Sequence, residues 1–362
     1  MAFASGTCRV AAAVALLTAA GAAPRARADI GLSLYGDVDG AIQTTGTRTG
    51  TADGFSAAKL ELFTTASAGN WSFLAETLFE AGDDNEFSVD VERIQVNYLY
   101  REWLRLAAGR FHTAIGYYND GFHHGAFFMP GVDRPQVVQF EDDGGLIPAH
   151  SVGVHADGRF PLGDSRLRYD LDVGNGRAAN RETVQINHDT NRPKAFNVRL
   201  RFEPSGALDG LIVGGNLYFD GIPARMATAG GPGALGPLRE WLAGVHAAYF
   251  EHGVHLVIEA YAIDHAELDT GASHWTYAGF AELGRSYGQL LPFVRYEYTR
   301  YPTEGDPFYG QTAADGYQTF SAGVKHSTSD NIALKAQAGV VVSHAASTDT
   351  LFTLTGQIAF AF

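Results

Sequence analysis

A strand-length pattern of alternating apolar and polar residues recurs from Asp29 to Phe362, and it constrains the fold more than any other feature of the sequence. The clearest instance is the last segment. Its apolar residues share one parity: Phe352, Leu354, Ile358, Phe360 and Phe362. Because alternate side chains of a β-strand point to opposite faces, such a segment has one apolar and one polar face. We therefore expect strands with a lipid face and a water face, as in a transmembrane β-barrel.

The pattern predicts an all-β, antiparallel, up-and-down barrel of about 16 strands, an even number as single-chain bacterial barrels have. The expected strands lie near residues 30–42, 55–66, 71–81, 87–100, 104–111, 150–160, 166–175, 196–204, 211–219, 240–251, 254–264, 274–286, 290–300, 319–327, 332–344 and 350–362. Boundaries read from sequence are uncertain by about two to four residues, so about 14 or 18 strands also fit. A register slip between Val91 and Ile94 indicates a bulge.

The connections between these strands alternate in length. Tight ones lie at 69–70, 101–103, 161–165, 252–253 and 327–331, and long polar ones near 43–54, 112–149, 176–195, 220–239, 265–273 and 301–318. Two outer connections, near 82–86 and 345–349, are short exceptions. Short periplasmic turns opposite longer outer loops are typical of a membrane barrel, whereas the two ends of a sandwich or propeller need not differ. Aromatic residues also recur near strand ends, where interfacial girdles belong: Trp71, Tyr98, Tyr100, Trp103, Trp241, Trp275, Tyr296 and Tyr298.

Residues 1–28 have the features of a cleaved secretory signal peptide. An apolar run from Val10 to Ala23 is too short for a spanning helix, which needs about 20 residues. Ala26-Arg27-Ala28 fits the small-x-small rule for cleavage. We therefore expect one barrel domain, residues 29–362, after removal of residues 1–28.

Composition excludes several classes of function. The only cysteine, Cys8, lies in the leader, so the remaining chain offers no disulfide and no cysteine metal site. The net charge is -14, and the leader contains three arginines but no acid, so its removal makes the chain more acidic. Nucleic acid is not an expected partner, because its backbone needs Lys and Arg to neutralise it. No cofactor is expected.

The C-terminal run Gly356-Gln-Ile-Ala-Phe-Ala-Phe362 resembles the assembly signal of outer-membrane barrels. With the leader and the loop pattern, the chain resembles the 16-stranded porins of the Gram-negative outer membrane. The runs Gly109–Asn119 and Phe140–His150 are also similar to a group of porin-like proteins, and distantly resemble phosphate-selective porins. The resemblance implies an outer-membrane location, contact with lipid and lipopolysaccharide, recognition of the C-terminal strand by the barrel-assembly machinery, and a homotrimer.

The longest connection, 112–149, joins the fifth and sixth expected strands and is rich in apolar residues, so we expect it to pack inside the barrel. In porins the loop at this position narrows the channel. Its acids are the candidate constriction residues: Asp120, Asp133, Glu141, Asp142 and Asp143. By parity, the wall offers inward bases: Arg105, Arg168, Arg199, Arg201, Arg295, Lys325 and Lys335. Loop acids opposite wall bases would create a transverse electric field across the channel. Alternatively, these charged side chains could simply line a water-filled lumen and form ion pairs with one another.

Other chemistry is weakly indicated. His112, His123, His124 and His150 have no known ligand spacing, so no metal site is expected. Acidic outer loops could bind Ca²⁺ or Mg²⁺, but none has the EF-hand pattern. Ser151 and His150 are adjacent on a strand and face opposite ways, which disfavours a nucleophile and base pair. No nucleophile elbow, phosphate loop or zinc-protease motif occurs, so we do not expect an enzyme.

The sequence therefore favours a porin for passive diffusion of small hydrophilic solutes or ions, narrowed by the loop near 112–149. One alternative is a substrate-specific channel for an anion or a sugar. A second is a non-conducting barrel that serves as an enzyme, adhesin or scaffold. The transported solute and the sign of ion selectivity stay open.

Overall fold

We analysed a computed structural model that describes residues 28–45, 52–81, 86–122, 126–141, 143–183, 185, 189–226, 233–344 and 350–362. Residues 1–27 of the expected leader lie outside the described residues, as do His123, His124 and Asp142 of the long loop. The strands are β1 (Asp29–Thr45), β2 (Ala52–Ala68), β3 (Trp71–Ala81), β4 (Phe87–Arg101), β5 (Leu104–His112), β6 (His150–Leu162), β7 (Ser165–Gly174), β8 (Ala195–Glu203), β9 (Leu211–Ile222), β10 (Leu238–Tyr249), β11 (Val254–Glu267), β12 (Ser273–Arg285), β13 (Leu290–Arg300), β14 (Tyr317–Ser327), β15 (Ile332–Ser343) and β16 (Leu351–Ala361).

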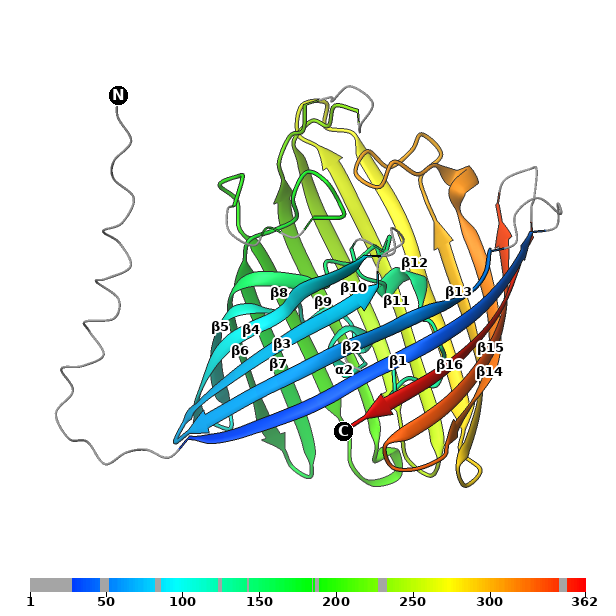
Figure 1. Cartoon of the computed structure of the whole chain (residues 1–362). Coiled ribbons are helices and arrows are strands. Elements are labelled where there is room, and N and C mark those ends of the chain that lie inside the picture. The colour runs from blue at the N-terminus through cyan, green and yellow to red at the C-terminus, as the bar shows by residue number, and fades with distance from the viewer. Residues whose placement is uncertain are drawn as a thin grey trace, which may run out of the picture.

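These strands form one closed barrel in which each strand pairs antiparallel with its neighbours in sequence (Figure 1). β1 and β16 close the sheet, with Tyr35 opposite Ala361, and Leu34 and Phe362 exchange backbone hydrogen bonds of 2.7 Å. Closure leaves no strand edge unpaired, which a barrel surrounded by lipid requires. The expected up-and-down barrel of 16 strands is confirmed, and each expected strand matches one of the observed strands.

The outer face of the barrel is apolar, as the alternation predicts. At least 45% of the surface is exposed for three outward residues, Val198, Leu200 and Val245. A sheet that faces water would normally carry polar side chains at such positions. Aromatic rings gather near both ends of the strands. Trp71 packs on Tyr98 beside the short turn 69–70, and Phe219 packs on Trp241 toward the opposite rim. No helix in the described ranges combines the length and the apolar character needed to cross a membrane.

Among the described residues, the ladder has three register shifts, of which one lies between Leu99 and Arg101 at the end of β4, and the other two lie within the barrel wall. Opposite Glu76 and Thr77 of β3, the partners change from Arg93 to Val91, which leaves Glu92 as an extra residue in β4. This is the bulge expected between Val91 and Ile94. A second shift lies between Asp37 and Asp39 of β1, where β2 contributes the extra residue. Bulges re-aim side chains, and both of these lie beside carboxylates that face the lumen.

The connection between β5 and β6 folds into the barrel, as the sequence predicts. It contains a short helix, α2 (Tyr118–Gly121), and a 3₁₀ turn, η2 (Gln136–Val138), and α2 lies inside the barrel in Figure 1. Two further 3₁₀ turns, η3 (Gly206–Leu208) and η4 (Ala313–Asp315), lie in other connections. Ile115, Tyr118, Val138, Leu146 and Ile147 of the inward loop are at most 1% exposed. The barrel core is therefore built largely from this loop and the inner wall.

Candidate functional site

Inward side chains of the wall hold the backbone of the first part of the loop. Glu259 on β11 accepts hydrogen bonds from the backbone N–H groups of Tyr117 and Tyr118, each at 2.6 Å. Asn216 on β9 accepts from Gly116 at 3.1 Å, and Asp172 on β7 accepts from Ala114 at 3.0 Å. A loop buried in a barrel needs such partners, because unpaired backbone groups there cost free energy. The wall thus supplies the hydrogen bonds that a strand or helix would otherwise provide.

Asp120, one of the expected constriction acids, forms an ion pair with the wall. Its two carboxylate oxygens accept from Arg199 at 2.9 and 2.8 Å, and Arg201 lies 3.8 Å away. Arg199, which is 1% exposed, also donates to Asp170 and to the Gly116 carbonyl. Partial burial alone would raise the pKa of Asp120, but the adjacent Arg199 lowers it to about 2. This pair fixes α2 against β8.

The second part of the loop is held by three more of the expected wall bases. Lys335 on β15 donates to the carbonyls of Ala126 and Gly131, the latter at 2.9 Å. Lys325 on β14 donates to the Phe127 carbonyl, and Arg295 on β13 donates to the Asp133 carbonyl at 2.7 Å. These three cations therefore donate hydrogen bonds to carbonyl groups of the loop backbone, which covers their charged groups.

Glu141 ties the end of the loop to β4 and β6. Its carboxylate accepts from the backbone N–H of His150 at 3.0 Å and lies 3.2 Å from the ring nitrogen Nδ1. The other ring nitrogen of His150 lies 2.7 Å from Glu92, the bulge residue of β4. Burial would raise the pKa of Glu141, but the ion pair and hydrogen bonds with His150 lower it to about 2.

Arg134 is the loop's own buried cation. It donates to the Val138 carbonyl through two nitrogens, at 2.9 and 2.7 Å. Its guanidinium lies 4.5 Å from the ring centroid of Phe140 and 5.6 Å from that of Tyr118. Among the described residues, the Val138 carbonyl and two aromatic rings contact this cation, and no carboxylate forms an ion pair with it. Burial lowers the pKa of Arg134.

The β8–β12 side of the lumen is filled. Arg177 pairs with Glu240 at 2.9 Å, and both side chains are at most 4% exposed. His265 on β11 pairs with Asp306 at 2.8 Å. Tyr309 donates to the Leu146 carbonyl at 2.8 Å, which joins an outer connection to the inward loop. Solute passage on this side would require breaking buried ion pairs.

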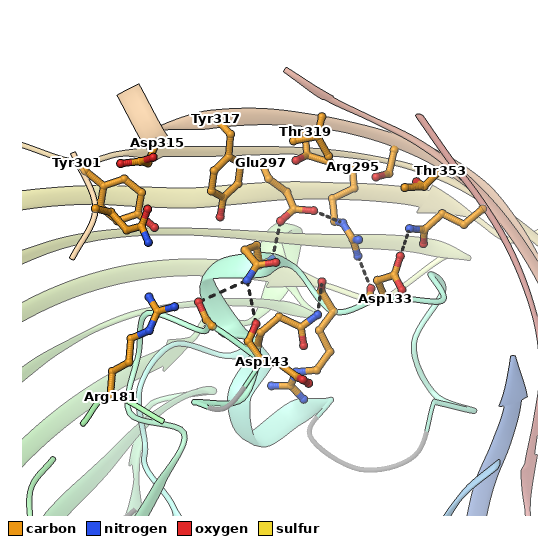
Figure 2. Close-up of a pocket in the computed structure, with 18 residues that line it drawn as sticks. Asp133, Asp143, Arg181, Arg295, Glu297, Tyr301, Asp315, Tyr317, Thr319 and Thr353 are labelled. Atoms are coloured by element: carbon orange, nitrogen blue, oxygen red, sulfur yellow. Dashed lines mark hydrogen bonds and ion pairs between the residues drawn. The ribbon is translucent and has the colours of Figure 1, made fainter. Parts of the chain in front are cut away.

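Three adjoining cavities occupy the opposite side, and Asp143 lines all of them. A cavity of about 500 Å³ lies between the loop and β13–β16, and Figure 2 shows Tyr317 and Thr319 of the wall facing the loop acids Asp133 and Asp143. A cavity of about 190 Å³ lies between the loop and β1–β2, and one of about 260 Å³ lies toward β3–β6. The first two share Asp133, Arg134, Gln139 and Asp143. Together they form a polar space beside the loop.

The expected site residues separate into groups. Asp133 and Asp143 line the open space, Glu141 lies at its β3–β6 end, and Asp120 lies in the ion pair with Arg199. Asp142 lies outside the described residues. Arg199, Arg295, Lys325 and Lys335 contact the loop, and Arg201 lies beside Asp120 and Asp170. Arg105 pairs with Asp157 at 2.7 Å and Arg168 with Glu203 at 2.6 Å, near the ends of their strands that face the short turns.

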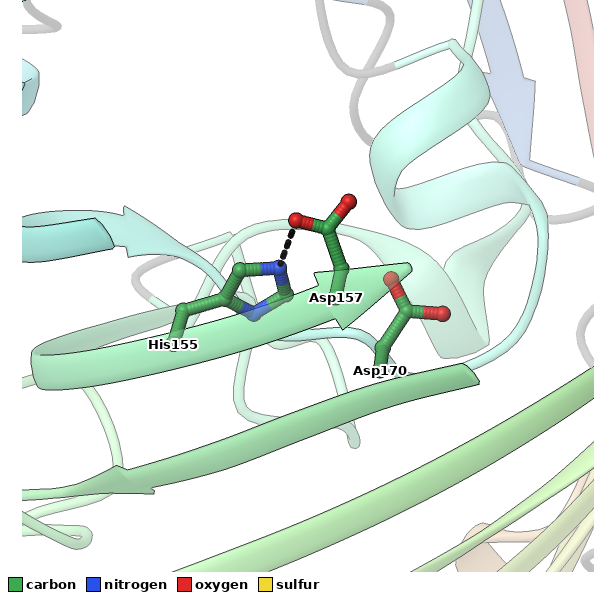
Figure 3. Close-up of side chains that lie close together, drawn as sticks. All are labelled: His155, Asp157 and Asp170. Atoms are coloured by element: carbon green, nitrogen blue, oxygen red, sulfur yellow. Dashed lines mark ion pairs between the residues drawn. The ribbon is translucent and has the colours of Figure 1, made fainter. Parts of the chain in front are cut away.

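One group of described residues brings metal-ligand types together: His155, Asp157 and Asp170, on the inner faces of β6 and β7 (Figure 3). Ligand atoms of the three lie within 4.8 Å of one another. Arginines already contact both carboxylates, since Arg105 binds Asp157 and Arg199 binds Asp170. His155 itself is held by Asp172 at 2.5 Å. We interpret this group as an ion-pair network, because the three arginines beside it, Arg105, Arg199 and Arg201, oppose a bound cation.

Sequence reasoning missed the wall acids that face the open space. Asp37 and Asp39 of β1 and Glu61 of β2 line the cavity of about 190 Å³. Their parity gives a usable signal, because Val38 between the two aspartates is 43% exposed on the outer face. The parity that marks the inward bases therefore marks these acids as well. The loop anchors Glu259 and Asn216 were also missed, as was Gln337, which accepts a hydrogen bond from the backbone N–H of Val132 at 2.9 Å. Nothing in the local sequence marks these residues as partners of a distant backbone.

Comparison with solved structures finds the same architecture in outer-membrane proteins of very different sequence. OmpT of Vibrio cholerae in its trimer form has a TM-score of 0.60 at 9% identity, over 92% of this chain and 99% of that chain. The outer membrane channel DcaP of Acinetobacter baumannii has a TM-score of 0.58 at 12% identity, over 94% and 100%. Salmonella typhi OmpF in complex with daunomycin has a TM-score of 0.59 at 14% identity, over 91% and 97%.

The sequence matches no protein-family model and no curated protein. At these low identities the structural likeness establishes a porin-like fold, in agreement with the resemblance expected from the sequence.

Proposed function

We propose that this chain is a porin of the Gram-negative outer membrane, through which small hydrophilic solutes and ions diffuse passively. The apolar outer face and the aromatic rings near both rims suit a barrel surrounded by lipid. The likeness in fold to the outer membrane channel DcaP and to OmpF supports the same reading. Export would use residues 1–28 as a cleaved leader.

One observation carries the proposal. The inward loop fills one side of the lumen and leaves adjoining polar cavities on the other, lined by charged and amide side chains rather than by a dry core. Water enters such polar spaces, because their side chains offer it several hydrogen-bond partners. In this proposal Asp133 and Asp143 of the loop form the constriction together with the facing wall.

A bilayer recording tests the proposal. The full chain, expressed in a Gram-negative host, is purified from the outer-membrane fraction, and N-terminal sequencing determines whether residues 1–28 have been removed. Heat-dependent migration on a gel verifies that the barrel is folded before single channels are recorded in a planar bilayer. Stepwise conductance is expected. A folded barrel without conductance would contradict the proposal and favour an adhesin, an enzyme or a scaffold.

A second candidate function is a substrate-specific channel. It is favoured because the loop and the outer connections fill a large part of the lumen. The buried pairs Arg177–Glu240 and His265–Asp306 close the β8–β12 side, so a passage would have to follow the cavities along the opposite wall. Narrow passages discriminate between solutes more strongly than wide ones. Liposome-swelling rates for a size series of neutral sugars distinguish the two, since a general porin shows a smooth decline with size and a specific channel shows one solute that departs from it.

Assembly forms part of the same proposal. The signal for the barrel-assembly machinery would lie at the strand that closes the barrel. It would consist of the outward side chains of β16 and the residue that follows this strand: Phe352, Leu354, Ile358, Phe360 and Phe362. A homotrimer in contact with lipid and lipopolysaccharide is proposed from the porin resemblance and the trimer form of OmpT. Removal of Phe362 is expected to lower the amount of folded barrel in the outer membrane, and cross-linking in native membranes tests the trimer.

A further inference from the structure

Carboxylates from the wall and from the inward loop line the smallest of the three cavities, which has a volume of about 190 Å³. Asp37 and Asp39 approach from β1, and Asp133 and Asp143 approach from the inward loop. Asp37 is 9% exposed, so its charge lies inside the barrel and is weakly screened by bulk water. Sequence reasoning expected bases on the wall opposite the loop acids, and at this cavity the wall presents acids on β1.

The cations near this cavity are already engaged. Lys59 on β2 pairs with Glu80 at 3.3 Å. Arg134 bonds to the Val138 carbonyl and stacks on Phe140, and Lys335 bonds to the carbonyls of Ala126 and Gly131. These contacts direct the donors of both buried cations toward the loop backbone. The open space is therefore left with an excess of carboxylates.

Two acceptor atoms at this cavity lack donors. Oδ1 of Asp39 and Oε1 of Gln357 are buried and accept no hydrogen bond from any described residue. The two residues are register partners on β1 and β16, and both line the cavity of about 190 Å³. Gln357 is 5% exposed. Buried acceptors without donors cost free energy, so a ligand that donates hydrogen bonds would be stabilised there.

The size of the space distinguishes between kinds of cation. A bare metal ion needs three or more ligand atoms gathered around one point, and among described residues only the His155 group shows that arrangement. The carboxylates of β1 and of the loop instead surround a cavity of about 190 Å³. An organic cation that bears several N–H donors fits both the volume and the unpaired acceptors.

We propose that this part of the lumen, bounded by Asp37, Asp39, Gln357 and Asp133, binds small organic cations with an ammonium or guanidinium group and selects them for passage. The inference rests on the proposed pore function. Carboxylates accept charge-assisted hydrogen bonds from such donors, and a ring of acids in a narrow passage favours cations over anions. Inorganic cations would share the preference through charge alone.

Ethylguanidinium and ethylurea form a matched pair of probes, because they have the same shape and differ in charge. Single channels are recorded across a KCl gradient, and each probe is then added at millimolar concentration. The wild-type pore is expected to prefer K⁺ over Cl⁻, and ethylguanidinium, but not ethylurea, is expected to reduce the K⁺ current.

The test variant is Asp37→Asn with Asp39→Asn. Its matched control is Asp209→Asn with Asp330→Asn, which changes net charge equally at exposed residues in connections distant from the cavity. Heat-dependent migration verifies folding of both. The test variant is expected to lose about fivefold of the K⁺ preference and most of the ethylguanidinium block, and the control is expected to behave as wild type.

Two results would overturn the inference while leaving the pore function intact: a conducting wild-type pore that prefers Cl⁻, or a test variant that matches wild type in both selectivity and block. If the test variant does not fold, the single variants Asp37→Asn and Asp39→Asn take its place, with the same criteria. A folded wild-type barrel without conductance would contradict the proposed function itself, and the inference would fail with it.

Discussion

Glu259 on β11 accepts the backbone N–H of Tyr118 at 2.6 Å and, with the same oxygen, the N–H of Tyr117. One inward carboxylate thus holds the start of α2, more than a hundred residues away in sequence. Its other oxygen accepts from the Tyr261 hydroxyl, so the carboxylate is itself fixed in place. The position of the loop, and hence the shape of the open lumen, depends on this contact.

Replacement of Glu259 by Gln is expected to loosen the loop. The amide keeps one acceptor oxygen but loses the charge that strengthens the bonds to the Tyr117 and Tyr118 N–H groups, a loss of about 1–3 kcal/mol. Open-channel current noise and the rate of limited proteolysis within residues 113–149 should both rise. Glu251→Gln, in the exposed turn between β10 and β11, is the control and should match wild type. Equal proteolysis rates in the two variants would refute the anchoring role.

Gly116→Ala should displace the same part of the loop for a steric reason. Gly116 has a φ of 68°, and a Cβ there would lie 2.1 Å from the Tyr261 hydroxyl and 2.5 Å from Glu259. Gly163, in the turn between β6 and β7, has a similar φ of 61° with nothing within 4 Å of the added Cβ. Gly163→Ala therefore reports the backbone strain alone, about 1–2 kcal/mol.

The comparison of these two alanine variants separates the cost of backbone strain from the cost of the steric clash between the added Cβ and its neighbours. Thermal denaturation followed by heat-dependent gel migration should show Gly116→Ala to be clearly less stable than Gly163→Ala. Gly116→Ala should also change single-channel conductance, and Gly163→Ala should leave it unchanged. Similar losses of stability in both would mean that the space around Gly116 relaxes freely.

The barrel could be predicted from the sequence because the signals that identify each strand are local. Alternation within one segment, such as Phe352–Phe362, is enough to identify a strand and its outer face. The inward path of the long loop also followed from its own composition. Each of these inferences needs only neighbouring residues.

The contacts of the site could not be predicted, because they join residues far apart in sequence. Parity shows that Lys335 points inward, but only the path of the loop reveals that Gly131 and Ala126 lie beneath it. Likewise, Asp37 and Asp133 face the same cavity only because the loop crosses the barrel toward β1. The distinction between a base that lines the pore and one that holds the loop therefore required the structure.

Arg199→Lys tests whether a wall cation holds the loop by geometry as well as charge. The Arg199 guanidinium contacts both oxygens of Asp120, one oxygen of Asp170 and the Gly116 carbonyl. A lysine ammonium cannot span these acceptors, because its three donors radiate from one nitrogen. We expect a loss of about 2–4 kcal/mol in stability, since the buried Asp170 would lose its contact with Arg199 and keep only the longer one with Arg201 at 3.4 Å.

Arg168→Lys is the matched control for Arg199→Lys. Arg168 contacts Glu203 through one nitrogen in a partly exposed pair, which a lysine can reproduce. Exposed pairs contribute about 0–1 kcal/mol, so its denaturation temperature should stay near wild type. Equal shifts in the two variants would show that Arg199 acts as a charge only.

Low pH should release the end of the loop through Glu141. The pKa of Glu141 in the folded protein is about 2, below the ordinary value of about 4.3 for glutamate. A group whose folded pKa is depressed stabilises the fold above its unfolded pKa, and this contribution is lost as the pH falls toward the folded pKa. The contact with His150 should therefore persist from neutral pH to about pH 4 and weaken between about pH 4 and pH 2. Single-channel recordings at stepped pH should show conductance changing in that window.

Glu141→Gln should produce the acid-like conductance at neutral pH, and Glu102→Gln, at an exposed turn residue, should behave as wild type. Conductance of Glu141→Gln that matches wild type at neutral pH would show that this carboxylate does not hold the loop.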